Sequence, residues 1–167
     1  MANYLKISVA ILFILSASRF IPHPPNFTSL IALSFYVPII FGLKFIPIVV
    51  MSFAITDLYF GFHNTILFTW GSVILIGLIT NYLSSGIFSR VVGVLFGASI
   101  FFVLSNFGVW LLSDIYANSI TGLMACYIFA LPFFYSTILS TISFSIIFEV
   151  IIISKRIYED YFKASVS

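Results

Sequence analysis

The chain has 167 residues and a net charge of +2; 62% of its residues are hydrophobic and only 7% are charged. Soluble domains carry about 25% charged residues, and a chain of this size buries only about 70% of its surface on folding, so the composition excludes a soluble domain and predicts an all-α, polytopic membrane protein. The small net charge argues against a nucleic-acid partner, and the single cysteine excludes an intrachain disulfide and a cysteine-cluster metal site.

The apolar runs along the chain predict one transmembrane domain of about six helices. A spanning helix needs about 20 mostly apolar residues, and Pro, Gly, Asn and charges mark the breaks between runs. The predicted helices cover residues 4–18, 29–42, 45–57, 65–83, 91–112 and 122–153. The last run is too long for one straight span, so Pro132 is expected to break it. The segment 122–130 is then either part of helix six, a re-entrant piece or a seventh span.

The first run also resembles a signal peptide, because its apolar stretch ends at the small residues 16–18. Arg19 and Pro22 follow directly, and the positively charged region before the run is a single lysine, Lys6. We therefore expect this segment to remain as the first transmembrane helix.

The basic residues predict the orientation of the helices. One set of helix ends carries six of them, and the opposite set carries only Arg19. The six are Lys6, Lys44, Arg90, Lys155, Arg156 and Lys163. Because cytoplasmic connections carry an excess of Lys and Arg, both termini are predicted to be cytoplasmic, in a chain that crosses the inner membrane several times.

This topology places most polar side chains on the non-cytoplasmic side, in the connections after helices one, three and five. The candidates are Arg19, His23, Asn26, Thr28, Asp57, His63, Asn106, Trp110, Tyr116 and Cys126. Their concentration predicts a pocket that opens away from the cytoplasm. Ionisable groups near a membrane tend to pair, so Asp57 is the expected partner of Arg19. An arginine in a pocket would hold a carboxylate or phosphate through its planar fork.

The two histidines have more than one interpretation. His23 lies among prolines and could simply cap a turn, and His63, which follows Gly61, could cap the third helix. Together with Asp57 and Cys126 they could instead form a metal site of mixed ligands. No HExxH or CxxC pattern is present, and we predict no metal and no cofactor. No GxSxG or P-loop pattern occurs either, and the chain is not predicted to be an enzyme.

Further positions are also open to two interpretations. Trp110 and Tyr116 could belong to an interfacial aromatic belt or could form a stacking surface for a flat ligand. Asn106, one helical turn from Trp110, could serve helix packing or line the pocket. Glu149, inside the last apolar run, is interpreted as a structural or partner-facing residue.

Four segments carry a resemblance to a known family. They are 22–28 (PHPPNFT), 57–63 (DLYFGFH), 105–110 (SNFGVW) and 122–134 (GLMACYIFALPFF). The chain resembles, on these motifs, an uncharacterised family of small bacterial membrane proteins. That family usually continues with Asn-Thr and Gly-Asp pairs, where this chain has Ser136-Thr137 and Ser140-Thr141. An acidic group of the family is therefore missing here.

The family in turn resembles the substrate-binding S components of energy-coupling factor (ECF) vitamin transporters in size, helix number and predicted outward pocket. The resemblance implies a membrane subunit that captures a small vitamin-like ligand and passes it inward with a separate coupling subunit and ATPases. In S components small residues of helix one face the coupling subunit; residues 8, 10 and 16–18 are small here, without a clean AxxxA repeat. The alternatives are a structural or assembly subunit of a membrane complex and an intramembrane enzyme.

Overall fold

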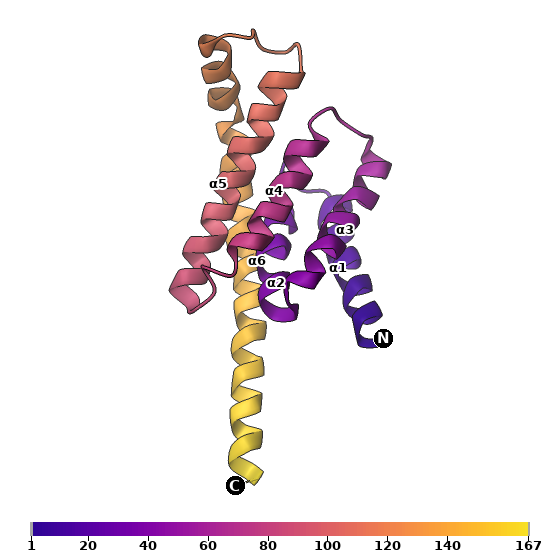
Figure 1. Cartoon of the computed structure of the whole chain (residues 1–167), viewed down its shortest axis with the longest axis vertical. Helices are drawn as coiled ribbons and strands as arrows, with labels where there is room; N and C mark the ends of the chain where they lie inside the picture. Colours follow the sequence, from indigo (N-terminus) through magenta and orange to yellow (C-terminus); the bar gives the residue numbers. More distant parts are fainter. Residues whose placement is uncertain (1, 167) are drawn as a thin grey trace.

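Six α-helices and one short 3₁₀ helix form the chain in the computed structural model, which describes the backbone of residues 2–166 and the side chains of residues 3–158 and 161 (Figure 1). The elements are α1 (Ala2–Phe20), α2 (Leu30–Phe41), η1 (Leu43–Phe45), α3 (Ile46–Phe60), α4 (Ile66–Ile79), α5 (Ile87–Leu112) and α6 (Ile120–Val166). Over residues 2–166 there is no β-strand. The prediction of an all-α fold with six helices is confirmed.

Four of the helices are long and apolar enough to cross a membrane. The apolar stretches are Asn3–Phe20, Leu43–Phe60, Ile87–Leu112 and Ile120–Tyr158. The other two predicted spans are shorter than expected, since α2 has 12 residues and α4 has 14. At 1.5 Å per residue these helices are about 18 and 21 Å long, against a hydrocarbon core of about 30 Å. The chain is a membrane protein that combines four full-length helices with two short ones.

Helix α2 lies at the centre of the bundle. Its nine residues from Leu30 to Pro38 are all buried, and it contacts α3, α4, α5 and α6. A helix that is apolar on every side is stable only where other elements surround it. Large apolar side chains are instead exposed on the surrounding helices, among them Phe13, Leu67 and Phe129. In a membrane these exposed side chains face lipid.

Helix α5 begins at Ile87, four residues before the predicted start at 91. The prediction used Arg90 as a boundary, because a charge ordinarily ends an apolar run. Arg90 is instead buried within α5, where the Glu149 side chain of α6 neutralises it. Arg90 therefore does not mark the start of the helix, because its charge is paired inside the bundle.

The ends of α3 and α4 also differ from the prediction. Helix α3 continues to Phe60, beyond the predicted end at 57, and stops where Gly61 adopts a φ of +96°. Asp57 therefore lies inside the helix and not after it. Helix α4 ends at Ile79, where 83 was expected, because residues 80–83 form turns and the Thr80 hydroxyl bonds back to the Gly77 carbonyl. The ends of α1 and α2 lie within two residues of the prediction.

The predicted break at Pro132 is wrong. Helix α6 runs without interruption from Ile120 to Val166, with Pro132 inside it, and the segment 122–130 is its first part (Figure 1). A proline removes one backbone donor, but transmembrane helices tolerate this when neighbouring groups compensate. The helix also continues past the predicted end at 153, and its last part extends beyond the other helices (Figure 1). The side chain of Lys163, used in the orientation argument, lies outside the described residues.

Candidate functional site

A cavity of about 520 Å³ lies among the α1–α2 connection, the α3–α4 connection and helices α1 to α6. One part of its wall is apolar and rich in phenylalanine: Leu30, Ile31, Phe53, Phe60, Phe101, Phe102, Val109, Phe133 and Phe134. The other part is polar: Arg19, His23, Asn26, Thr28, His63, Thr65, Thr69, Ser105, Asn106 and Thr137. Cavities of a few hundred Å³ that combine an apolar wall with a few polar groups are typical of small-molecule sites.

The cavity brings together six of the ten predicted site residues. They come from α1, from the two connections and from α5: Arg19, His23, Asn26, Thr28, His63 and Asn106. Asp57 does not line the cavity but forms an ion pair with Arg19, which does. Trp110, Tyr116 and Cys126 are not part of its wall.

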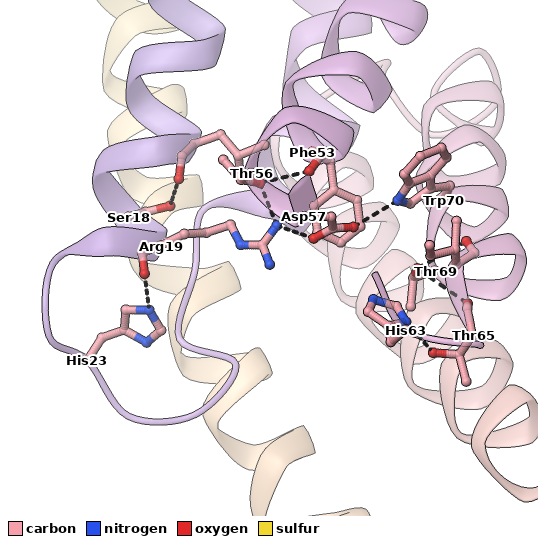
Figure 2. Close-up of polar contacts among 12 residues, drawn as sticks. Ser18, Arg19, His23, Phe53, Thr56, Asp57, His63, Thr65, Thr69 and Trp70 are labelled. Atoms are coloured by element: carbon pink, nitrogen blue, oxygen red, sulfur yellow. Dashed lines mark hydrogen bonds and ion pairs between the residues drawn. The ribbon is translucent and has the colours of Figure 1, made fainter. Parts of the chain in front are cut away.

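Arg19 and Asp57 form the ion pair that the sequence predicted (Figure 2). Nη1 of Arg19 lies 2.6 Å from Oδ1 of Asp57 and also donates to the Thr56 hydroxyl. The other carboxylate oxygen of Asp57 accepts a hydrogen bond of 2.9 Å from Nε1 of Trp70, on α4. The Asp57 side chain is only 1% exposed, so both oxygens are satisfied within the bundle. This network joins α1, α3 and α4 and fixes the position of Arg19.

Part of the Arg19 guanidinium stays free for other contacts. Its Nε and Nη2 make no hydrogen bond within the part of the chain that the structure describes, and the side chain lines the cavity. The guanidinium carbon lies 4.8 Å from the ring centre of Phe53 and 5.0 Å from that of Phe60. Two rings and one carboxylate thus hold a planar donor group that can still bind a hydrogen-bond acceptor.

His23 holds the α1–α2 connection in place. Its Nδ1 lies 2.7 Å from the Pro24 carbonyl oxygen and its Nε2 lies 3.3 Å from that of Arg19. The hydroxyls of Ser18 and Ser29, 2.8 Å apart, clasp the two ends of this connection. His23 is therefore a wall residue of the cavity whose ring N–H can donate to a backbone carbonyl of the turn, as the turn-capping interpretation predicted.

Asn26 occupies the left-handed region of the backbone, with a φ of 63°. Asparagine tolerates this conformation better than most residues, since its short side chain can bond locally. The turn exposes Asn26 at the cavity. The positive φ at this position therefore accounts for the asparagine.

His63 lies in the exposed α3–α4 connection, where its Nδ1 is 2.7 Å from the Thr65 hydroxyl (Figure 2). This hydrogen bond joins two side chains of the connection, and the start of α4 has no side-chain cap. Among the described residues, no group of three or more His, Cys, Asp or Glu side chains lies close enough to hold a metal ion. The mixed metal site considered from the sequence therefore has no geometric support.

The other predicted residues lie near the connection between α5 and α6. Nε1 of Trp110 donates to the Ala117 carbonyl at 3.1 Å, and Sγ of Cys126 lies 3.4 Å from the Asn106 carbonyl oxygen. Nδ2 of Asn106 bonds to the Phe102 carbonyl at 2.8 Å, while the residue still lines the cavity. Tyr116 is partly exposed in the connection. Trp110 and Cys126 thus have structural roles in these contacts.

A second buried ion pair lies away from the cavity. Arg90 of α5 donates two hydrogen bonds to Glu149 of α6, at 2.7 and 2.6 Å, and the Tyr36 hydroxyl of α2 donates a third at 2.9 Å. The Phe148 ring stacks on Tyr36 with 5.2 Å between ring centres. The interpretation of Glu149 as a structural residue agrees with these contacts.

Several wall residues were not predicted from the sequence. Thr65, Thr69 and Thr137 lie in apolar helices or next to them, and the phenylalanines of the wall resemble the many that face lipid. Trp70, which holds Asp57, was also missed. Its position in an otherwise apolar helix 13 residues after Asp57 gave no spacing signal.

Comparison with known proteins found one match, to a family. No curated protein and no solved structure is detectably similar to the chain. The model of a family of unknown function, DUF6580, matches residues 2–159, which cover α1 to α5 and most of α6. The expected membership of an uncharacterised family is confirmed to that extent. The chain belongs to the family of unknown function DUF6580.

Proposed function

We propose that the protein is a membrane subunit that captures a small molecule in the cavity beside Arg19. The single observation that carries the proposal is that Arg19 is fixed by Asp57 while its Nε and Nη2 remain available at a cavity of about 520 Å³. A purely structural ion pair would have no need of a cavity at its free side. The polar and aromatic wall fits a metabolite-sized ligand with an apolar body and an acceptor group, such as a carboxylate or phosphate, directed at Arg19.

The proposed location is the bacterial inner membrane, with both termini in the cytoplasm and the cavity on the opposite side. The charge asymmetry supports this orientation, and the ion pairs strengthen it. Arg19, the one basic residue that departs from the charge rule, is neutralised by Asp57. Four lysines, Arg90 and Arg156 are predicted on the other side.

The proposed partners are the lipid bilayer, the ligand and a separate transmembrane coupling subunit with ATPases, as in ECF transporters. The chain has no P-loop pattern with which to hydrolyse ATP itself. Helix α1 offers a surface for such a subunit, because Leu5, Val9 and Phe13 are exposed along it. Neither a nucleic-acid partner nor an enzymatic reaction is part of this proposal.

A second candidate function is a structural or assembly subunit of a larger membrane complex. One observation favours it: the end of α6 extends beyond the other helices, and its residues Ile157 and Tyr161 are 64% and 75% exposed (Figure 1). An apolar side chain on a projecting helix is typical of a contact surface.

The two candidates are separated by what the purified protein retains. The protein is purified in mild detergent, and small molecules released on denaturation are identified by mass spectrometry, with Arg19→Lys as the matched variant. The lysine keeps the positive charge beside Asp57 but lacks the planar guanidinium that can donate two parallel hydrogen bonds to a ligand. A metabolite bound by the native chain and lost from the variant supports the binding subunit. No retained ligand, unchanged solute uptake on gene deletion and a stable non-transporter partner would together favour the assembly subunit.

A further inference from the structure

Helix α6 carries a row of polar side chains along its buried side. Thr137, Thr141, Ser145 and Glu149 follow one another at intervals of four residues, and their exposed fractions are 5%, 0%, 5% and 8%. Successive members lie about one turn apart, so the row extends about 18 Å along the helix. That is more than half of the hydrocarbon thickness.

The two ends of this row meet the two polar sites of the bundle. Thr137 lines the cavity, and Glu149 is held by Arg90 and Tyr36. The two middle members, Thr141 and Ser145, therefore lie between the cavity and the inner ion pair.

The middle hydroxyls differ from most other buried hydroxyls of the described residues, and only that of Ser136, off the row, shares their lack of a partner. Ser34 and Thr137 bond back to the carbonyl four residues earlier, which is the usual solution in a helix. Thr141 Oγ1 and Ser145 Oγ are buried and make no hydrogen bond within residues 3–158. The Ser145 hydroxyl interacts with that of Tyr36, so Thr141 is the clearer of the two cases. A buried hydroxyl without a partner costs free energy, so two on one row require an explanation.

We propose that bound water continues the cavity inward along this row, past Thr141 and Ser145, as far as Tyr36 and Glu149. Water is both a donor and an acceptor, and a buried water binds where two to four polar groups surround it. Hydroxyls one turn apart, with the cavity at one end and a carboxylate at the other, provide such groups. The inner ion pair then closes the path. The proposal goes beyond the proposed function, because it holds whether or not the cavity binds a solute.

The path can be tested by the accessibility of introduced cysteines to silver ions, which travel in water and react with thiols. In a Cys126→Ala background, Thr141→Cys and Ser145→Cys are each compared with two controls. Ala98→Cys is buried in an apolar part of α5, and Ile142→Cys faces outward next to the row. Membranes are exposed to Ag⁺, and the remaining thiol is measured after denaturation.

We expect both test positions to be modified at least tenfold faster than both controls. Rates equal to that of Ala98→Cys would overturn the proposal. A ligand search that fails while these positions react would refute the binding function and leave the water path standing, so the two failures are distinguishable.

A second test replaces Thr141 and measures the thermal midpoint of unfolding, without a chemical reagent. In Thr141→Val a methyl replaces the hydroxyl at nearly constant shape. If the native hydroxyl is dry, the change removes an unsatisfied group and raises the thermal midpoint. If the hydroxyl holds water, we expect the midpoint to fall by about 2–4 °C. Ser143→Ala, which removes an exposed hydroxyl from the same helix, is the control. An unchanged or raised midpoint would speak against bound water.

Discussion

The Arg90 guanidinium and the Glu149 carboxylate face each other through two parallel hydrogen bonds, although 59 residues separate them in the chain. Both side chains are largely buried, at 6% and 11% exposure. Two charges taken out of water in this way are stable only together. The pair therefore fixes the packing of α5 against α6.

Removing one member of this pair should destabilise the fold strongly. We expect Glu149→Gln to lower the free energy of unfolding by about 3–5 kcal/mol, because Arg90 stays buried without its counter-charge. The double variant Arg90→Met with Glu149→Leu should recover most of the loss. The measurement is the thermal midpoint in detergent. A double variant as unstable as the single one would contradict this account.

Trp70 should contribute to the outer ion pair through its indole N–H. Trp70→Phe keeps an aromatic ring but removes the hydrogen bond to Asp57. We expect a loss of about 1.5–3 kcal/mol, as for hydrogen bonds to charged groups. Trp110→Phe is the matched control, since its indole bonds to an exposed carbonyl, and it should cost less. Equal effects at the two positions would show that Asp57 does not depend on Trp70.

Arg19 should determine ligand affinity through its free donors. We expect Arg19→Lys to weaken binding of an acidic ligand by about 10–100-fold, the equivalent of losing about 1.4–2.7 kcal/mol. Isothermal titration with the ligand identified by mass spectrometry measures the change. Tyr116→Phe, outside the cavity wall, serves as the control and should bind normally. An unchanged affinity in Arg19→Lys would exclude a bidentate contact.

Pro132 should not be needed for the shape of α6. It is exposed and lies inside a continuous helix, so Pro132→Ala adds a backbone donor without disturbing packing. We expect unchanged or slightly higher helicity by circular dichroism and an equal or higher thermal midpoint. A lower midpoint would indicate that the proline fixes a bend that the bundle requires.

The orientation can be tested with the same cysteine-free background, Cys126→Ala. Asn26→Cys lies in the exposed α1–α2 connection, and Ser85→Cys lies in the exposed α4–α5 connection. In intact cells an impermeant maleimide should label the first and should label the second only after lysis. The reverse pattern would place the cavity on the cytoplasmic side.

The sequence was sufficient to predict the fold class, the number of helices and one of the two ion pairs. Arg19 and Asp57 could be paired because each lies near the end of an apolar run on the same predicted side. Arg90 and Glu149 could not, because Arg90 was used as a boundary and its partner lies far along the chain. Long-range pairing inside a bundle leaves no local pattern in the sequence.

The cavity wall shows the same limit. Polar residues of the α1–α2 and α3–α4 connections were predicted correctly as neighbours, because the topology brings these connections to one side, but Tyr116 of the α5–α6 connection lies outside the wall. The phenylalanines of the wall could not be distinguished from those that face lipid, because both environments select the same residue type. The row of hydroxyls on α6 was also missed, since serine and threonine are common in transmembrane helices and only the structure shows which of them lack a partner.

The unbroken course of α6 has a mechanical consequence. With 47 residues it is about 70 Å long, more than twice the hydrocarbon thickness. Its first half carries Phe133, Phe134 and Thr137 of the cavity wall, and its other end projects past the bundle. An unbroken helix is stiff, so a force on its projecting end would be transmitted along α6 to the cavity wall at the other end.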